Sequence, residues 1–148
     1  MKYFYHGSSI DIDGEYLEPR PSRVLDGEKA VFATNNIYIS LVFIPQWTDN
    51  DFDLTHYNDK WYLVEQYPGA FSIFENKDGW IYSVDSTNFK SDDRLGMKRT
   101  EFISKKKVKI VKRVYIKDVL KILKKKSDII FVTYDEKLEA IEEYFINK

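Results

Sequence analysis

The stretch Lys2-Tyr3-Phe4-Tyr5-His6-Gly7-Ser8-Ser9 opens the chain and decides the fold we expect. Its three consecutive aromatic residues predict a buried strand. The strand then ends on a histidine, a glycine and two serines. A strand with this ending can place an imidazole and bare backbone beside a ligand. His6 and Gly7 are therefore the first candidates for a functional site.

The composition is that of one folded domain over residues 1–148. The chain has 11 Tyr, 10 Phe and 3 Trp, and this length can bury a sizeable core. It has no cysteine, which excludes disulfides, zinc–thiolate sites and thiol nucleophiles. Two histidines, His6 and His56, are too few for a histidine-rich metal site, so we expect no metal. Without a long apolar run or a secretory pattern, the sequence predicts a cytoplasmic protein with no membrane contact.

Positive charge is concentrated in one segment, although the net charge of the whole chain is −1. Between Lys105 and Lys126 there are 11 Lys or Arg residues against the single Asp118. Such a block can contact nucleic acid or another polyanion. It can equally be a solvated lysine surface on a strand and a helix, and the sequence leaves both interpretations open.

The first half of the chain alternates strand-like and polar stretches. A polar loop is expected from residue 10 to 29, and a second buried strand at 30–34. Asn35 or Asn36 can cap the helix that follows, which Pro45 ends. Residues 46–60 are predicted to be a loop, 61–67 a strand, and 70–74 either a short strand or a helical turn.

The second half predicts strands first and helices last. Strands are expected at 79–84, 100–104 and 107–116, and a polar loop at 85–99. Apolar residues at helical spacing predict a helix at 117–126, followed by a strand at 128–132. Thr133 and Glu136 match a capping box at the start of a last helix. The order predicts an α+β fold with a helix-strand-helix tail over 117–148.

Common phosphate-binding and hydrolase motifs are missing from the sequence. The six glycines form neither G-x-G-x-x-G nor a P-loop. The chain also lacks H-E-x-x-H and G-x-S-x-G. Kinase, zinc-protease and nucleophile-elbow chemistry therefore have no support.

Three separate segments share an order with a known family. They are His6-Gly7-Ser8, then Val31-Phe32-Ala33-Thr34 with a helix that carries Ser40-x-x-Phe43, and finally Glu101-Phe102-Ile103. This order resembles the ADP-ribosyltransferase superfamily, in the His-Tyr-Glu branch that includes diphtheria toxin and the poly-ADP-ribose polymerases. The resemblance covers about residues 2–116 and implies split antiparallel β-sheets with flanking helices.

The resemblance implies a role for each matching residue. His6 would bind a ribose hydroxyl of NAD, and Gly7 would offer its backbone to the nicotinamide carboxamide. Ser40 would be a second partner of the amide, and Phe43 would stack on the nicotinamide ring. Glu101 would hold a hydroxyl of the nicotinamide ribose and stabilise positive charge as the glycosidic bond breaks.

The same resemblance adds three residues to the expected NAD-binding set and shows one departure from the family pattern. Ser8, Thr34 and Tyr38 join the expected NAD-binding residues, and His6 and Glu101 are the expected catalytic pair. The family usually carries tyrosine where this chain has Phe43, and Tyr38 and Tyr57 are candidate substitutes. The expected activity is cleavage of NAD, as a substrate, with transfer of ADP-ribose to an acceptor. The acceptor could be a protein, a nucleic acid or a small molecule.

Other functions remain open at this stage. An RNA 2′-phosphotransferase shares the fold and would use the basic segment to hold RNA, but its several arginines and second histidine have no clear match here. A non-catalytic module could use the lysines to bind nucleic acid or protein. If His6 is only a core histidine and Glu101 a surface charge, then His6, Phe43 and Glu101 should not face one cleft.

Overall fold

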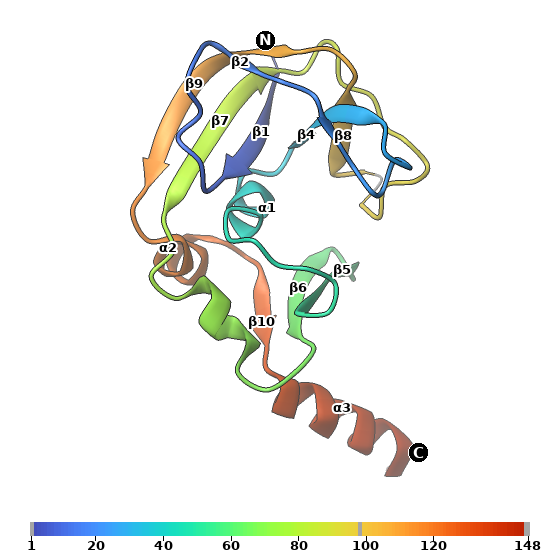
Figure 1. Ribbon diagram of the computed structural model, residues 1–148. Coiled ribbons are helices and arrows are strands. Elements are labelled where there is room, and N and C mark those ends of the chain that lie inside the picture. Colours follow the sequence, from blue (N-terminus) through green and yellow to red (C-terminus); the bar gives the residue numbers. More distant parts are fainter. Residues whose placement is uncertain (1, 98, 147–148) are drawn as a thin grey trace.

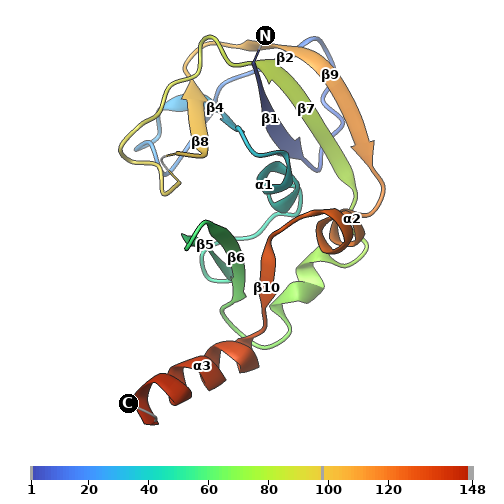
Figure 2. The same ribbon diagram turned by 180° about the vertical axis from the view of Figure 1, so that it is seen from behind.

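The computed structural model describes residues 2–97 and 99–146, and it has the α+β architecture that the sequence predicts. A large curled antiparallel sheet lies at one end of the molecule, and a small sheet at the other (Figure 1). A short helix lies between them, and the C-terminal helix extends away from the body, as the view from behind also shows (Figure 2).

The large sheet holds most of the strands. Its order is β2-β9-β7-β1-β4-β3, and β8 pairs with β4. The bounds are β1 (Tyr3–Ser8), β2 (Tyr16–Leu17), β3 (Arg20–Pro21), β4 (Lys29–Thr34), β7 (Gly79–Asp85), β8 (Glu101–Ser104) and β9 (Val108–Ile116). The expected loop at 10–29 therefore contains two short strands, because Tyr16–Leu17 pairs with β9 and Arg20–Pro21 with β4.

The sheet opens between β1 and β4. These two strands are paired in register at Tyr5 and Thr34 alone among the described residues. By contrast, β1 pairs with β7 along its whole length. The end of β1 that carries His6 and Gly7 is therefore not paired with β4, and the sheet is split at this place.

The small sheet corrects one expectation. It consists of β5 (Phe52–Tyr57), β6 (Lys60–Glu65) and β10 (Ile130–Val132), in the order β10-β6-β5. The predicted loop at 46–60 is thus wrong for β5. Asn58 and Asp59 both have positive φ angles (50° and 62°), so they form the tight turn of a hairpin. The outward residues of β5 are polar, which hid the strand in the sequence.

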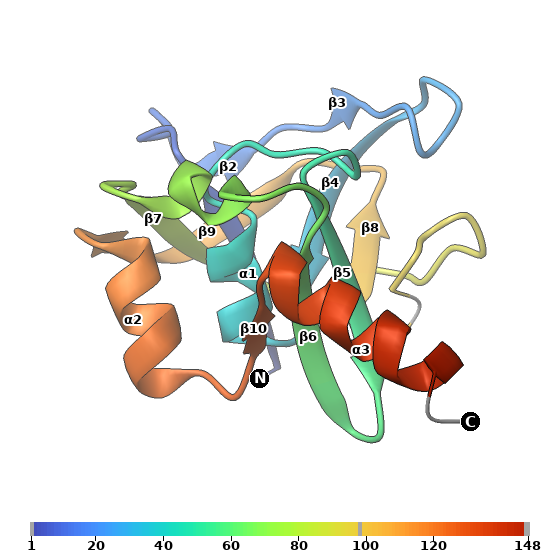
Figure 3. The ribbon, with the colours of Figure 1, turned by 90° about the horizontal axis from the view of Figure 1, so that it is seen from below.

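The helices are α1 (Ile37–Val42), α2 (Val119–Lys126) and α3 (Tyr134–Ile146), and the 3₁₀ helix η1 covers Ala70–Phe74. The segment 70–74, which the sequence left open, is therefore a helical turn. The predicted order of helix, strand and helix after residue 117 is observed. Seen from below, the edge strand β10 of the small sheet lies between α2 and β6 (Figure 3). Within the described part of the chain, no helix has the length and apolar character needed to cross a membrane.

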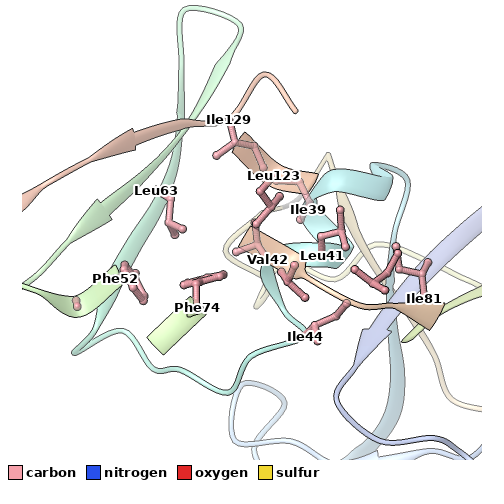
Figure 4. Close-up of a cluster of buried hydrophobic side chains, with 13 residues drawn as sticks. Ile39, Leu41, Val42, Ile44, Phe52, Leu63, Phe74, Ile81, Leu123 and Ile129 are labelled. Atoms are coloured by element: carbon pink, nitrogen blue, oxygen red, sulfur yellow. The ribbon is translucent and has the colours of Figure 1, made fainter. Parts of the chain in front are cut away.

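Helix α1 is the centre of the main core. Asn36 caps it, since the side-chain oxygen accepts hydrogen bonds from the backbone N–H groups of Tyr38 and Ile39. Its buried residues join a cluster that reaches α2 and both sheets (Figure 4). The members are Ile39, Leu41, Val42, Ile44, Phe52, Leu63, Ala70, Phe74, Ile81, Ile116, Val119, Leu123 and Ile129.

Two glycines let this helical segment approach the large sheet closely. A Cβ atom at Gly7 would lie 1.8 Å from the Ser40 carbonyl oxygen. One at Gly79 would lie 2.6 Å from the Ser8 carbonyl oxygen and 2.4 Å from a methyl carbon of Ile44. Both spaces are too small for any side chain. Gly7 is therefore required by the packing of α1 on β1, and Gly79 by the closeness of Ser8 on β1 and of Ile44 after α1.

Candidate functional site at the split in the sheet

A cavity of about 330 Å³, here called the split cavity, lies where β1 and β4 separate. Most of the residues predicted for the site line it, namely His6, Gly7, Thr34, Ser40, Phe43 and Glu101. Tyr5, Ser22, Val24, Phe32 and Ala33 complete the lining. The structure therefore brings His6, Phe43 and Glu101 to one cavity. This would not be expected if His6 were only a core histidine and Glu101 a surface charge.

Strand register explains how Glu101 reaches this place. Tyr5 on β1 is opposite Thr34 on β4, and Thr34 is opposite Glu101 on β8. Residues directly opposite on neighbouring antiparallel strands share one face of a sheet. Glu101 is thus about 10 Å from Tyr5 across the sheet, at a strand spacing of about 4.8 Å. The helix α1 covers the same face and adds Ser40 and, just beyond its last residue, Phe43.

His6 joins the two strands at the split. Its Nδ1 lies 2.7 Å from the Phe32 carbonyl oxygen on β4. A carbonyl oxygen only accepts hydrogen bonds, so Nδ1 carries the proton. Burial lowers the pKa of His6 below its usual value of 6.5, against the opposing effect of the bond to Phe32, and the nearby Arg20 cation lowers it further. The ring is therefore neutral at pH 7, and its Nε2 is an acceptor.

Glu101 sits in apolar surroundings, and no cation among the described residues lies beside it. Burial raises the pKa of its carboxyl group to about 7. At neutral pH the group is therefore divided between its protonated and ionised forms. Such a carboxylate favours a ligand that brings either a positive charge or hydroxyl donors.

Gly7 and Ser40 lie in close contact at the split cavity. The Ser40 carbonyl approaches the backbone of Gly7, as described above. The Ser40 hydroxyl donates to the Ile37 carbonyl at 2.5 Å, within its own helix. Its oxygen lone pairs remain able to accept a hydrogen bond, for example from an amide NH₂ group.

Phe43 offers an aromatic surface at the rim. The ring is 38% exposed and stacks on Trp47, with the centroids 5.7 Å apart and the planes at 9°. Trp47 is itself fixed, because its indole N–H donates to the Val42 carbonyl at 2.8 Å. Phe43 is therefore held in one orientation, which favours stacking with a flat ligand.

Three of the predicted residues lie outside the split cavity. Ser8 lines a neighbouring cavity, and its hydroxyl accepts from the Ile10 N–H. Tyr38 packs against the main core cluster, because it is two positions from Ser40 on the helix and so points about 200° away. Tyr57 is 67% exposed at the hairpin turn. Of the three candidates for the stacking role, Phe43, Tyr38 and Tyr57, only Phe43 lines the split cavity.

Comparisons of this chain with protein-family models, with curated proteins and with solved structures found no match. The site must therefore be interpreted from its own geometry. Among the described residues, no group of three or more His, Asp or Glu side chains is arranged to hold a metal ion.

The neighbouring cavity, about 640 Å³, continues from the split cavity. The two share His6, Ser22 and Phe32 as lining residues. Its wall carries Arg20 and several polar side chains, including the acidic Asp11, Asp13 and Glu18. The two cavities are therefore adjacent at His6.

Sequence reasoning missed the loop residues Ser22 and Val24 in the lining. Arg94 fixes their loop, because its guanidinium pairs with Asp26, Glu28 and Asp92. Leu25 is fully buried in the same loop, within a small cluster that includes Leu95 and Ile103. A lone leucine between Arg23 and Asp26 was the one available signal that this polar stretch folds back onto the protein.

Proposed function

We propose that this protein is an NAD-dependent ADP-ribosyltransferase of the His-Tyr-Glu type. One observation carries the proposal: three segments far apart in sequence place His6, Phe43 and Glu101 around a single cavity of ligand size. The split between β1 and β4 also agrees with the split antiparallel sheets that the family resemblance implies.

The nicotinamide end of NAD fits the chemistry of the split cavity. Its flat ring stacks on the exposed face of Phe43, opposite Trp47. The carboxamide lies beside the Ser40 hydroxyl oxygen and the backbone of Gly7. Because the nicotinamide ring of NAD is positively charged, its arrival favours the ionised form of Glu101.

Glu101 then acts on the ribose next to that ring. Its carboxylate accepts a hydrogen bond from a ribose hydroxyl and stabilises positive charge on the anomeric carbon. The bond from this carbon to the nicotinamide nitrogen breaks, and its electron pair leaves with nicotinamide, which becomes neutral. An acceptor forms the new bond to the anomeric carbon and releases its proton to water or to Glu101.

His6 binds rather than reacts. Its neutral ring accepts a hydrogen bond from a ribose hydroxyl at Nε2, while Nδ1–H is held by the Phe32 carbonyl. The rest of the dinucleotide extends past His6 into the neighbouring cavity, where Arg20 offers a positive charge to phosphate and Ser8 offers a hydroxyl group.

The other functions have weaker support. No arginine or second histidine lines the split cavity within the described residues, so no observation favours the RNA 2′-phosphotransferase. A non-catalytic binding module does not explain why a carboxyl group is kept in apolar surroundings beside His6, since burial of such a group is costly.

The test measures the release of nicotinamide from NAD by chromatography, for the wild type and for Glu101→Gln. The amide keeps the shape of the carboxylate but not its charge, so we expect a loss of about 100-fold or more, the scale seen when one such stabilising group is removed. Glu139→Gln, on the exposed face of α3, is the matched control and should keep full activity.

Two results would overturn the proposal. One is wild-type protein that neither binds NAD nor releases nicotinamide when nucleic acid, protein and small nucleophiles are supplied. The other is a Glu101→Gln variant with wild-type activity.

A further inference from the structure

A third cavity, about 590 Å³, lies between the β5–β6 hairpin and the segment that leads into β8. We call it the hairpin cavity. The hairpin provides Leu54, Thr55, His56 and Trp61, and the segment before β8 provides Gly96, Met97, Arg99 and Thr100. None of these residues lines the split cavity.

The hairpin cavity is fixed next to Glu101. Thr100, in its wall, is the residue directly before Glu101. The Met97 carbonyl accepts hydrogen bonds from both the Thr100 and the Glu101 backbone N–H groups, at 2.9 and 2.8 Å. The Asn35 side chain also donates to the Arg99 carbonyl at 3.2 Å. A molecule in this cavity therefore lies next to the backbone of Glu101, whose side chain lines the split cavity.

The lining has an aromatic part and a cationic part. His56 and Trp61 are opposite each other on the hairpin, and their rings are 4.9 Å apart. Met97 adds a flexible thioether that adapts to flat rings. The Arg99 side chain is exposed, and its guanidinium makes no hydrogen bond or ion pair with any described residue. No carboxylate is present among the lining residues, so an anionic ligand is favoured over a cationic one.

We propose that the hairpin cavity binds the acceptor of the ADP-ribosyl group, and that this acceptor is single-stranded nucleic acid. A base stacks on the ring pair of His56 and Trp61, and Arg99 forms a forked contact with the adjoining phosphate. This inference rests on the proposed function for the transfer step, but not for binding. A separate cationic segment between Lys105 and Lys126, which lies mostly on β9 and α2 and outside this cavity, also favours a polyanion.

The step balances without a further reactant. A nitrogen or oxygen atom of the nucleotide forms a bond to the anomeric carbon of the ribose. The bond to nicotinamide breaks, and nicotinamide leaves with the electron pair. The proton of the attacking N–H or O–H group goes to Glu101 or to water, and nothing is oxidised or reduced.

The experiment has two separate readouts on the full chain. The first is binding of a fluorescent single-stranded oligonucleotide without NAD, measured by anisotropy for the wild type, Arg99→Ala, His56→Ala and Lys60→Ala. Arg99 and His56 are exposed, so their removal should not unfold the protein. We expect about tenfold or greater weakening for Arg99→Ala and His56→Ala. Lys60→Ala removes a charge from the turn of the same hairpin but not from the cavity, and it should change binding little.

The second readout is transfer of ADP-ribose from NAD to the same oligonucleotide, detected by mass spectrometry. We expect modified oligonucleotide with the wild type and much less with Arg99→Ala. Three results would overturn the inference. The first is equal binding by the wild type and Arg99→Ala. The second is a free mononucleotide that is bound and modified in preference to the oligonucleotide, and the third is modification of protein and not of the oligonucleotide. If binding follows the expectation but the wild type releases no nicotinamide, the proposed function fails and the acceptor role fails with it, while the nucleic-acid site stands.

Discussion

Glu101 lies where the proposed reaction needs a carboxylate, but its burial lowers the stability of the folded protein. An isolated carboxyl group in apolar surroundings disfavours its own ionised form, and the pKa of about 7 reflects this. Nothing in the described structure compensates by placing a cation beside it. Such a group is more readily explained by a ligand than by the stability of the fold.

This cost predicts that Glu101→Gln stabilises the free protein at high pH. Between 4.5 and about 7, the folded state holds a proton that the unfolded state has already lost, so wild-type stability falls as the pH rises through this window. The variant does not titrate. We expect similar unfolding free energies near pH 5, and a variant more stable by on the order of 2 kcal/mol at pH 8. Urea unfolding at the two pH values checks this, and a variant less stable than wild type at pH 8 would contradict it.

His6 predicts the opposite dependence. Its pKa is lowered by burial, so below the usual value of 6.5 the unfolded state takes up a proton that the folded state refuses. The contribution of His6 to stability is present above pH 6.5 and is lost as the pH falls toward its pKa in the folded protein.

His6→Asn keeps a donor for the Phe32 carbonyl but removes the titration. We expect the variant to lose less unfolding free energy than the wild type between pH 7.5 and pH 5. The matched control is His56→Asn, the same substitution at an exposed histidine outside the split cavity. Parallel curves for His6→Asn and the wild type would show that His6 is not buried as a neutral ring.

At the scale of elements, the buried Glu65 fastens the C-terminal part of the chain to β6. One carboxylate oxygen accepts from the Phe71 N–H at 2.8 Å, and the other accepts from the Tyr134 N–H at 3.0 Å. The residue is only 4% exposed. It therefore connects η1 and the first turn of α3 to the same strand, while the rest of α3 buries no side chain in the described structure.

We expect Glu65→Ala to lower the unfolding free energy by about 2–3 kcal/mol, since it leaves two N–H groups without their acceptor. Hydrogen exchange should also accelerate across Tyr134–Ile146 more than elsewhere. Glu139→Ala, on the exposed side of α3, should show neither effect. Unchanged exchange in α3 after Glu65→Ala would mean that Lys137 and the capping box hold the helix alone.

The elements that sequence predicted well are those with local signals. Asn36 and the pair of Thr133 and Glu136 marked helix starts, and the structure confirms both caps. β5 lacked such a signal. It is an edge strand, and its exposed residues Asp53, Thr55 and His56 are of the types common in loops.

In the candidate site, His6, Gly7 and Glu101 lie at strand ends that a pattern can mark. Val24 and Ser22 could not be found in this way, because contacts distant in sequence place their loop: Arg94 pairs with Glu28, and Leu25 packs with Leu95.

At the scale of the whole molecule, charge is separated although it nearly cancels. The segment between Lys105 and Lys126 carries 11 Lys or Arg residues and a single acidic residue. Within the described residues its only ion pair is that of Lys105 with Glu28. Lys124, Lys125 and Lys126 are exposed together at the end of α2. A polyanion therefore meets a concentrated positive surface on a protein whose net charge is −1.

We expect the protein to bind heparin or a cation exchanger at pH 7.5, and the binding to weaken steeply with salt. Changing Lys124, Lys125 and Lys126 to Gln should lower the salt concentration at elution clearly. The matched control changes Lys2, Lys29 and Lys60 to Gln, which removes the same charge elsewhere, and it should have a smaller effect. Equal shifts in the two triple variants would identify these lysines as an ordinary solvated surface.

The two glycines beneath α1 have a consequence for any genetic study of this protein. Gly7 lines the split cavity and Gly79 does not, yet a Cβ atom has no room at either position. A screen of random variants scored by activity alone would rank both as essential, together with Glu101. Soluble yield separates the two classes: variants of Gly7 and Gly79 should be lost through misfolding, whereas inactive variants of Glu101 should accumulate as folded protein.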